Sequence, residues 1–199
     1  LKVSPVCFGT WKIVARTARP PAVKAIEKAY RLGLNFFDTS DNSGESEEWL
    51  GGAIREGYLP RDKVIVATKT GLPTTVSEKF GVDISRKRIL KQVEKSRKVL
   101  GLDTIPLYQI HAHDPKTPVS ELVSTMNQLI DQKKIMHYGL SNYGPGELEY
   151  LIEYCNDSGL RKPVSLQNAY NMAYFGSDSA EAMKLAKEEG LHFLAHSPL

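Results

Sequence analysis

The sequence predicts an α/β fold, a (β/α)8 TIM barrel that is incomplete in the 199 residues given. Short apolar runs alternate strictly with amphipathic segments, a pattern that produces a parallel sheet with helical crossovers. The runs are evenly spaced apart from one longer step, which indicates a repeated strand–helix unit. No Gly-x-Gly-x-x-Gly follows any run, which counts against a doubly wound dinucleotide-binding sheet. We expect one domain over residues 1–199, with about seven units and without the last strand and C-terminal helices.

Each predicted strand is a short run of apolar, often β-branched residues that stops at polar or ionisable ones. The fourth run meets His111, His113 and Asp114, and Pro115 then prevents any continuation. An apolar run that ends in this way is typical of a buried parallel strand with chemistry at its carboxyl end. In chain order, the predicted strands are Val6–Phe8, Leu34–Phe37, Val64–Thr68, Leu107–His111, Ile135–Leu140, Val164–Leu166 and Phe193–Ala195.

The segments between the strands carry apolar residues at helical spacing, together with start and stop signals. Pro20 and Pro21 preset the first turn of one helix, and Gly33 ends it. Ser46 is expected to cap the next helix, whose first turn is acidic. Thr117 is expected to cap a later one. The remaining predicted helices cover Asp83–Leu100, Leu148–Cys155 and Ser179–Glu189.

The composition, with 41% hydrophobic and 25% charged residues, is that of an ordinary globular domain. A net charge of +3 is too small to indicate a nucleic-acid partner, and the densest basic cluster falls on a predicted solvated helix face. Cys7 and Cys155 lie inside apolar runs and are expected to be buried free thiols. No membrane-spanning stretch or signal peptide is visible. We therefore expect a cytoplasmic protein.

The residues at or just after the strand ends combine an acid, an amine, imidazoles, hydroxyls and amides. In a barrel the carboxyl ends of the strands surround one mouth, so these groups can act together. Nearby charges tune the protonation of an acid or a base, and amides with hydroxyls suit recognition of a carboxamide. Each residue alone is more often structural, but their matching placement predicts an active site. They are Thr10, Asp38, Lys69, His111, Ser141, Asn142, Gln167 and His196.

Eight short motifs, or groups of motifs, follow one another in a specific order along the chain. They are Gly9-Thr10-Trp11, Asn35–Thr39, Gly44–Glu48 with Leu50-Gly51, Ala67–Lys69, Tyr108–His111, Gly139–Asn142, Gln167-Asn168 with Tyr170-Asn171, and Ala195–Leu199. In this order the chain resembles an aldo-keto reductase from Val3 to Leu199. The resemblance implies hydride transfer between a nicotinamide cofactor, usually NADP(H) with NAD(H) possible, and an aldehyde or ketone. The implied partner is a small-molecule carbonyl compound, without nucleic acid or membrane.

The resemblance also implies roles for individual residues. In that family, the residues matching Asp38 and Lys69 tune a catalytic tyrosine, and the histidine matching His111 orients the carbonyl. Trp11 and His113 are expected in the substrate pocket, a core tryptophan being the alternative for Trp11. The residues implied to contact the cofactor are Thr10, Asp38, Ser141, Asn142, Gln167, His196, Ser197 and Leu199, with His196 at a position that usually carries a stacking aromatic ring.

One position departs from the family pattern. The catalytic tyrosine lies five residues after the aspartate, where this chain has Ser43, and the following segment is about two residues shorter than in the family. Two explanations are open. Either residues of a mobile loop are missing from the given sequence between Asn42 and Ser43, or the protein is a catalytically weak, cofactor-binding regulatory pseudoenzyme of the same fold.

A rival interpretation is a metal-dependent barrel hydrolase. His111 and His113 form a His-x-His pair at a strand end, and the period of two in a strand would place both imidazoles on one face. No further histidine–aspartate set accompanies this pair in the sequence. We therefore rank this interpretation below the reductase and expect no metal site. The sequence indicates neither the substrate nor the oligomeric state.

Overall fold

The computed structural model describes residues 1–74, 81–173 and 177–198. Its strands form a single seven-stranded parallel sheet in the order of the sequence. They are β1 (Phe8–Gly9), β2 (Phe36–Asp38), β3 (Ile65–Thr70), β4 (Ile105–Ile110), β5 (Ile135–Ser141), β6 (Ser165–Ala169) and β7 (His192–His196).

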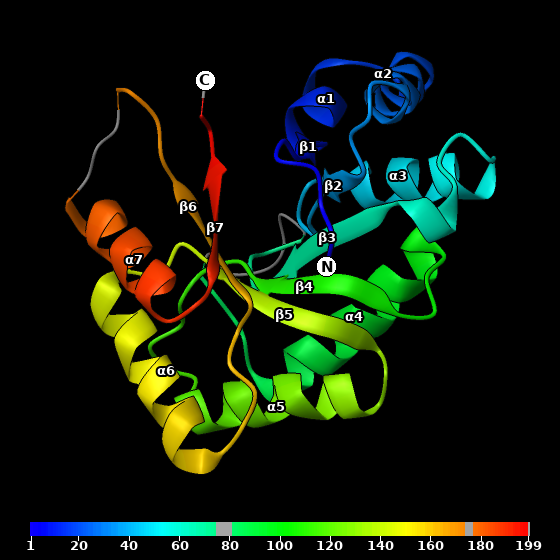
Figure 1. Cartoon of the computed structure of the whole chain (residues 1–199). Coiled ribbons are helices and arrows are strands. Elements are labelled where there is room, and N and C mark those ends of the chain that lie inside the picture. The colour runs from blue at the N-terminus through cyan, green and yellow to red at the C-terminus, as the bar shows by residue number, and fades with distance from the viewer. Residues whose placement is uncertain (75–80, 174–176, 199) are drawn as a thin grey trace.

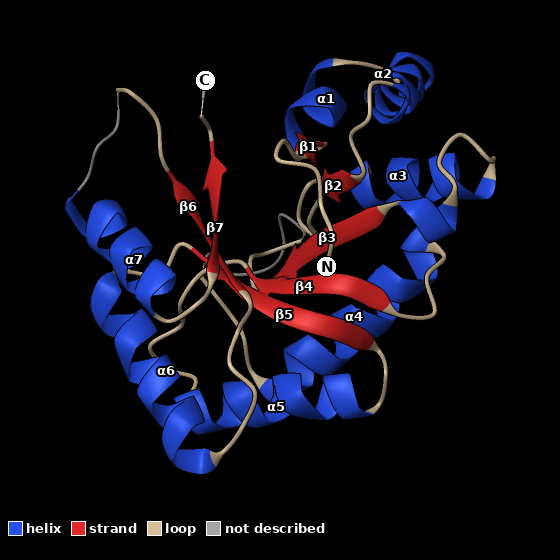
Figure 2. Cartoon of the chain, viewed as in Figure 1, coloured by secondary structure: helices blue, strands red, loops and turns tan. Residues whose placement is uncertain are grey.

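Helices connect these strands and cover the outer face of the curved sheet (Figure 1). They are α1 (Trp11–Arg16), α2 (Arg19–Arg31), α3 (Ser46–Arg55), α4 (Arg86–Leu100), α5 (Val119–Asp131), α6 (Pro145–Ser158) and α7 (Ser177–Glu188). The sheet is a half-barrel, with β1 and β7 at its two ends, and within the described sheet each of these two strands has one neighbour (Figure 2). The predicted incomplete (β/α)8 barrel is therefore confirmed.

The centre of the sheet is its most buried part. All six residues of β4 are buried, and the strand pairs in parallel with β3 on one side and β5 on the other. On the outer face, Tyr108 and Ile110 belong to the large apolar core shared with α4, α5 and α6. On the inner face, Leu107 packs with Phe36 and Ala67. This inner packing forms the floor beneath the strand ends.

Two predicted helix caps are wrong. Helix α3 begins at Ser46 itself, whose buried hydroxyl lies 2.6 Å from Oγ1 of Thr39 instead of capping the helix. Thr117 donates its hydroxyl to Oδ2 of Asp114 at 2.8 Å, and Pro118 occupies the cap position of α5. In both cases a tertiary or turn partner competes successfully for the hydroxyl.

The helix α1 was not predicted. None of its residues is buried, so the segment has no apolar stripe from which periodicity could reveal a helix. Both cysteines are free, as predicted, although Cys155 is buried and Cys7 only half-buried. The described helices are too short or too polar to span a bilayer.

Candidate active site

A buried ion pair lies at the mouth of the half-barrel. Asp38 ends β2, and the parallel register pairs it with Ala67, so that Lys69 lies two residues further along β3 on the same face. Nζ of Lys69 is 2.5 Å from Oδ2 of Asp38 and donates to the Thr39 carbonyl at 2.9 Å. The two side chains are only 6% and 17% exposed. A buried charge is costly without a partner, and each of these side chains supplies that partner to the other.

Two amides extend this pair to further strands. Nε2 of Gln109, on β4, donates to Oδ1 of Asp38 at 3.3 Å, and Nε2 of Gln167, on β6, makes a weaker contact with the same oxygen at 3.5 Å. Sequence reasoning missed Gln109, which is fully buried. The signal was present, because Gln109 precedes His111 by two residues and so faces the same side of the strand.

His111 follows β4 and is fixed by its backbone N–H, which donates to the Thr70 carbonyl at 2.8 Å. Burial, followed by the charges of Lys69 and His196, lowers the pKa of His111 to about 3. The imidazole is therefore neutral at physiological pH. Its Nδ1 is buried without a hydrogen-bond partner among the described residues, as is Oε1 of Gln109. The mouth thus retains unmet hydrogen-bonding capacity that a bound polar molecule can meet.

Asn142 ties three strand ends together. Its backbone has a φ of 55°, in the left-handed region that asparagine tolerates. Its Nδ2 donates to the His111 carbonyl at 2.8 Å and to Oγ of Ser141 at 3.1 Å, while Oδ1 lies 3.1 Å from Nε2 of His196. Both the Nδ2 and the Oδ1 of Asn142 are therefore hydrogen-bonded to residues at the ends of other strands.

His196 is half-buried at the end of β7. Burial and the charge of Lys69 lower the pKa of His196, and Asp38 offsets part of that change. A neutral ring that bonds to Oδ1 of Asn142 carries its proton on Nε2, which leaves Nδ1 to accept from Oγ of Ser197 at 3.3 Å.

The other predicted site residues differ in their burial and in their contacts. Thr10 is buried and donates both its backbone N–H and its hydroxyl to the Asp38 carbonyl at 3.0 Å. Trp11 is 61% exposed at the start of α1, so the core-tryptophan alternative is wrong. Ser197 lies beside His196, and Leu199 lies outside the described residues.

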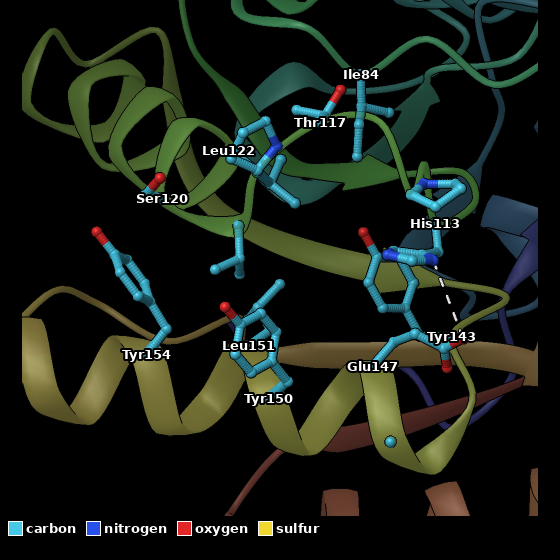
Figure 3. A pocket seen from close by; sticks show the side chains of 14 residues that line it. Ile84, His113, Thr117, Ser120, Leu122, Tyr143, Glu147, Tyr150, Leu151 and Tyr154 are labelled. Carbon is cyan, nitrogen blue, oxygen red and sulfur yellow. Dashed lines mark ion pairs between the residues drawn. The ribbon is translucent and has the colours of Figure 1, made fainter.

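His113 lies apart from the ion pair. Its ring packs edge-on against Tyr143, with the ring centroids 5.5 Å apart, and Nδ1 is 3.9 Å from Oε1 of Glu147. These groups line a cavity of about 740 Å³ on the outer side of the barrel (Figure 3). The strand ends at Ile110, so the period of two does not extend to His113, and the shared face proposed for a hydrolase is wrong. Within the described ranges, no three His, Cys, Asp or Glu side chains are grouped as metal ligands.

Comparison with known proteins places the chain. The family model described as "Aldo/keto reductase family" matches residues 5–199. The chain belongs to the aldo/keto reductase family. The resemblance inferred from the motifs is thereby confirmed.

Individual relatives agree with this assignment. The chain is 36% identical to "Aldo-keto reductase YhdN" of Bacillus subtilis (strain 168) over 155 residues, which cover 75% of this chain and 46% of the relative. It is 32% identical to "L-galactose dehydrogenase" of Arabidopsis thaliana over 216 residues, which cover 96% of this chain and 65% of the relative. The chain therefore spans about half to two thirds of the length of these relatives.

A solved structure supports the fold. The holo form of aldo-keto reductase AKR11C1 from Bacillus halodurans superposes with a TM-score of 0.83 at 27% sequence identity. The match covers 98% of this chain and 62% of the other. The half-barrel described above thus corresponds to part of a larger aldo/keto reductase structure.

Ser43, at the position where the resemblance implies a tyrosine, lies in a hydrogen-bonded turn. The Ser43 backbone N–H donates to the Ser40 carbonyl at 3.2 Å, and the hydroxyls of the two serines are in contact. Ser43 is 8% exposed. The described turn therefore holds a small, buried hydroxyl at the position where the resemblance implies a phenol.

Two further acids, absent from the predicted site, lie behind the sheet. Thr68 and Thr70 alternate with Lys69 along β3 and so face α4. Thr70 donates to Oδ2 of Asp41 at 2.7 Å, and Thr68 donates to Glu47 at 2.7 Å. Burial raises the pKa of Asp41 to about 6 against the opposing effect of its hydrogen bonds. These acids hold the loop after β2 and the start of α3 against the outer face of β3, away from the mouth of the half-barrel.

Proposed function

We propose that this aldo/keto reductase chain carries the active site of an NAD(P)H-dependent oxidoreductase that reduces an aldehyde or ketone to an alcohol. NADP(H) is the expected cofactor, and NAD(H) is possible. The proposal includes a small-molecule carbonyl substrate, one domain over residues 1–199, a cytoplasmic location, and no nucleic-acid or membrane partner.

One observation carries the proposal: three strands deliver polar side chains to a single carboxylate at the end of a fourth. Lys69, Gln109 and Gln167 contact the two oxygens of Asp38. This arrangement is built before any substrate arrives, because the ion pair and the amides position one another. Preorganised donors of this kind stabilise negative charge that develops on a substrate oxygen.

Lys69 and His111 have different roles in the proposed reaction. When bound, a reduced nicotinamide supplies the hydride, and the carbonyl oxygen then becomes an alkoxide. The Lys69 ammonium, held by Asp38, stabilises that negative charge. Neutral His111 offers one N–H donor that orients the carbonyl without adding a competing charge.

The cofactor-contacting residues fit a nicotinamide by their chemistry. Ser141 and Gln167 are buried at adjacent strand ends and present a hydroxyl and an amide to a carboxamide. His196 offers a flat ring, and Asn142 fastens it to the end of β5. Thr10, Ser197 and Leu199 remain the candidates for contacts with the rest of the cofactor.

A second candidate function is a catalytically weak, cofactor-binding regulatory protein. Ser43 favours it, because an aliphatic hydroxyl is a far weaker acid than a phenol. His111 does not replace the missing acid, since its imidazolium form is scarce at neutral pH when the pKa is about 3. Protonation of the alkoxide then falls to water. A positioned general acid contributes about 10²–10⁴-fold to rate, so turnover should be slow.

The test measures cofactor binding and turnover separately. NADPH should quench tryptophan fluorescence, and NADPH absorbance should fall slowly with an aromatic aldehyde. Lys69→Met should lower turnover about a hundredfold, whereas Lys87→Met, an exposed lysine on α4, should change nothing. Ser43→Tyr should raise turnover.

The outcomes separate the candidates. Failure of the chain to bind NADPH or NADH would sink both functions. Fast turnover that Ser43→Tyr does not increase would exclude the weak enzyme and retain the reductase. Binding without any turnover, even in Ser43→Tyr, would leave the regulatory protein.

A further inference from the structure

The outer cavity that contains His113 is separate from the mouth and has no assigned ligand. It lies between the start of α5 and one face of α6 (Figure 3). Its volume of about 740 Å³ falls within the range of small-molecule sites, roughly 300–1,000 Å³. Ile84, Leu122 and Leu151 supply apolar walls.

The face of α6 turned to this cavity is aromatic and acidic. Glu147, Tyr150, Leu151 and Tyr154 follow one another at helical spacing along α6 and line the cavity, with Glu147 at the end nearest His113 (Figure 3). Among the described residues that line the cavity, Glu147 is the single acidic side chain, and none is a lysine or an arginine. The α6 sequence contains four acidic residues and no lysine or arginine. The local field therefore favours a cation over an anion.

A buried hydroxyl in the same cavity has no partner. Tyr143 is 2% exposed, and its OH makes no hydrogen bond within the described part of the chain. Figure 3 shows this hydroxyl directed into the space between Leu122 and Ile84. Burial, followed by the charges of Asp114 and Glu147, raises the pKa of Tyr143, so the group stays a neutral phenol. A buried polar group without a partner is destabilising, and a ligand atom at this point would supply the missing hydrogen bond.

Glu147 is similarly available. Its carboxylate is 3.9 Å from the His113 ring, beyond hydrogen-bond distance, and the side chain remains 43% exposed at the cavity. A carboxylate and a phenol oxygen can both accept hydrogen bonds from one ammonium group. The faces of tyrosine and histidine rings stabilise a cation and also stack on an aromatic body.

We propose that this cavity binds a small primary arylalkylamine, with the ammonium at Glu147 and Tyr143 and the ring among Tyr150, Tyr154 and the apolar wall. The site is independent of the reductase function, because none of these residues contacts the Asp38–Lys69 pair. An amine is preferred to a carboxylate ligand because no lysine or arginine lines the described cavity.

The experiment titrates the whole chain with phenethylamine, phenylethanol and phenylacetate and follows binding by NMR. These probes share the aromatic body and differ in charge. Phenethylamine should bind about tenfold more tightly than either analogue, the effect expected of one charge-assisted hydrogen bond. It should shift the ring resonances of Tyr143 and Tyr154. This comparison needs no variant and so does not depend on any substitution folding.

Matched variants then locate the ammonium. Glu147→Gln should weaken phenethylamine binding about tenfold, and Tyr143→Phe should weaken it about threefold. Glu149→Gln makes the same charge change on the same helix outside the cavity lining and should leave binding unchanged. Equal affinity for the three probes, or equal effects of the two glutamine variants, would overturn the proposal. So would ring shifts confined to the mouth of the barrel.

Discussion

Asp38 and Asp41 stand three residues apart but lie in opposite electrostatic surroundings. Asp38 faces the barrel mouth, where the Lys69 ammonium is 2.5 Å away. Asp41 faces α4, where its hydrogen-bond donors, Thr70 and Gln92, are neutral. Burial is therefore offset by a directly contacting charge at Asp38, and at Asp41 mainly by neutral hydrogen-bond donors. The chain turns between the two, which places one carboxylate in the candidate site and the other in the packing behind it.

The pH dependence of stability should reveal the Asp41 carboxyl. Burial raises its pKa from the ordinary 3.8 to about 6, so the folded state binds the proton more tightly than the unfolded state. Stability from this group is thus present below pH 3.8 and declines as the pH rises to about 6. In urea denaturation, the stability of the wild type relative to Asp41→Asn should fall by about 3 kcal/mol across that window. A difference that does not vary with pH would contradict the assignment.

His111 provides a control of opposite sign. Its pKa falls from 6.5 to about 3 on folding, so the unfolded state binds the proton more tightly. Stability from neutral His111 is present above pH 6.5 and is lost as the pH falls toward 3. As the pH rises, the wild type should therefore gain stability relative to His111→Gln. Over the same range of pH it should lose stability relative to Asp41→Asn.

At the scale of elements, the close approach of α3 to α4 depends on one glycine. A Cβ added at Gly51 would lie 2.5 Å from the Val99 carbonyl oxygen and 2.7 Å from Cα of Leu100. Both neighbours are backbone atoms, so they cannot rotate out of the way. The packing of the second and third strand–helix units against each other therefore requires a residue without a side chain at this position.

Gly51→Ala should lower the free energy of unfolding by about 2 kcal/mol, the cost typical of overpacking a core. Gly146→Ala is the matched control, because Gly146 lies in the first turn of α6 with nothing within 4 Å of an added Cβ. That substitution should raise stability by about 0.5–1 kcal/mol through higher helix propensity. Thermal or urea denaturation measures both. Equal effects of the two substitutions would show that the helices separate more easily than the structure indicates.

At the scale of the whole molecule, stability should be graded across the half-barrel. The central strand β4 is buried along its full length between two neighbours, whereas no residue of β7 is fully buried and the strand pairs in the described sheet only with β6. Local opening costs little where few groups are buried and most where the core is continuous.

Hydrogen exchange measured on peptides should follow this gradient. Amides of Ile105–Ile110 should exchange last, near the rate of global unfolding, and amides of His192–His196 should exchange markedly faster. Binding of NADPH should slow exchange in β7, because His196 and Ser197 belong to the proposed cofactor contacts. Equal protection of both strands without cofactor would indicate that β7 is covered in a way the described residues do not reveal.

The sequence by itself determined the strand–helix alternation, the inventory of polar groups at the strand ends and the family. These depend on local spacing and on short motifs, which are written directly in the order of residues. Only the tertiary structure decided that Gln109 joins Asp38, that Asn142 fastens His196, and that His113 turns away to Tyr143 and Glu147. The physical reason is that side-chain direction beyond a strand end, and competition for a hydroxyl such as that of Ser46, depend on neighbours distant in sequence, whose positions local periodicity does not encode.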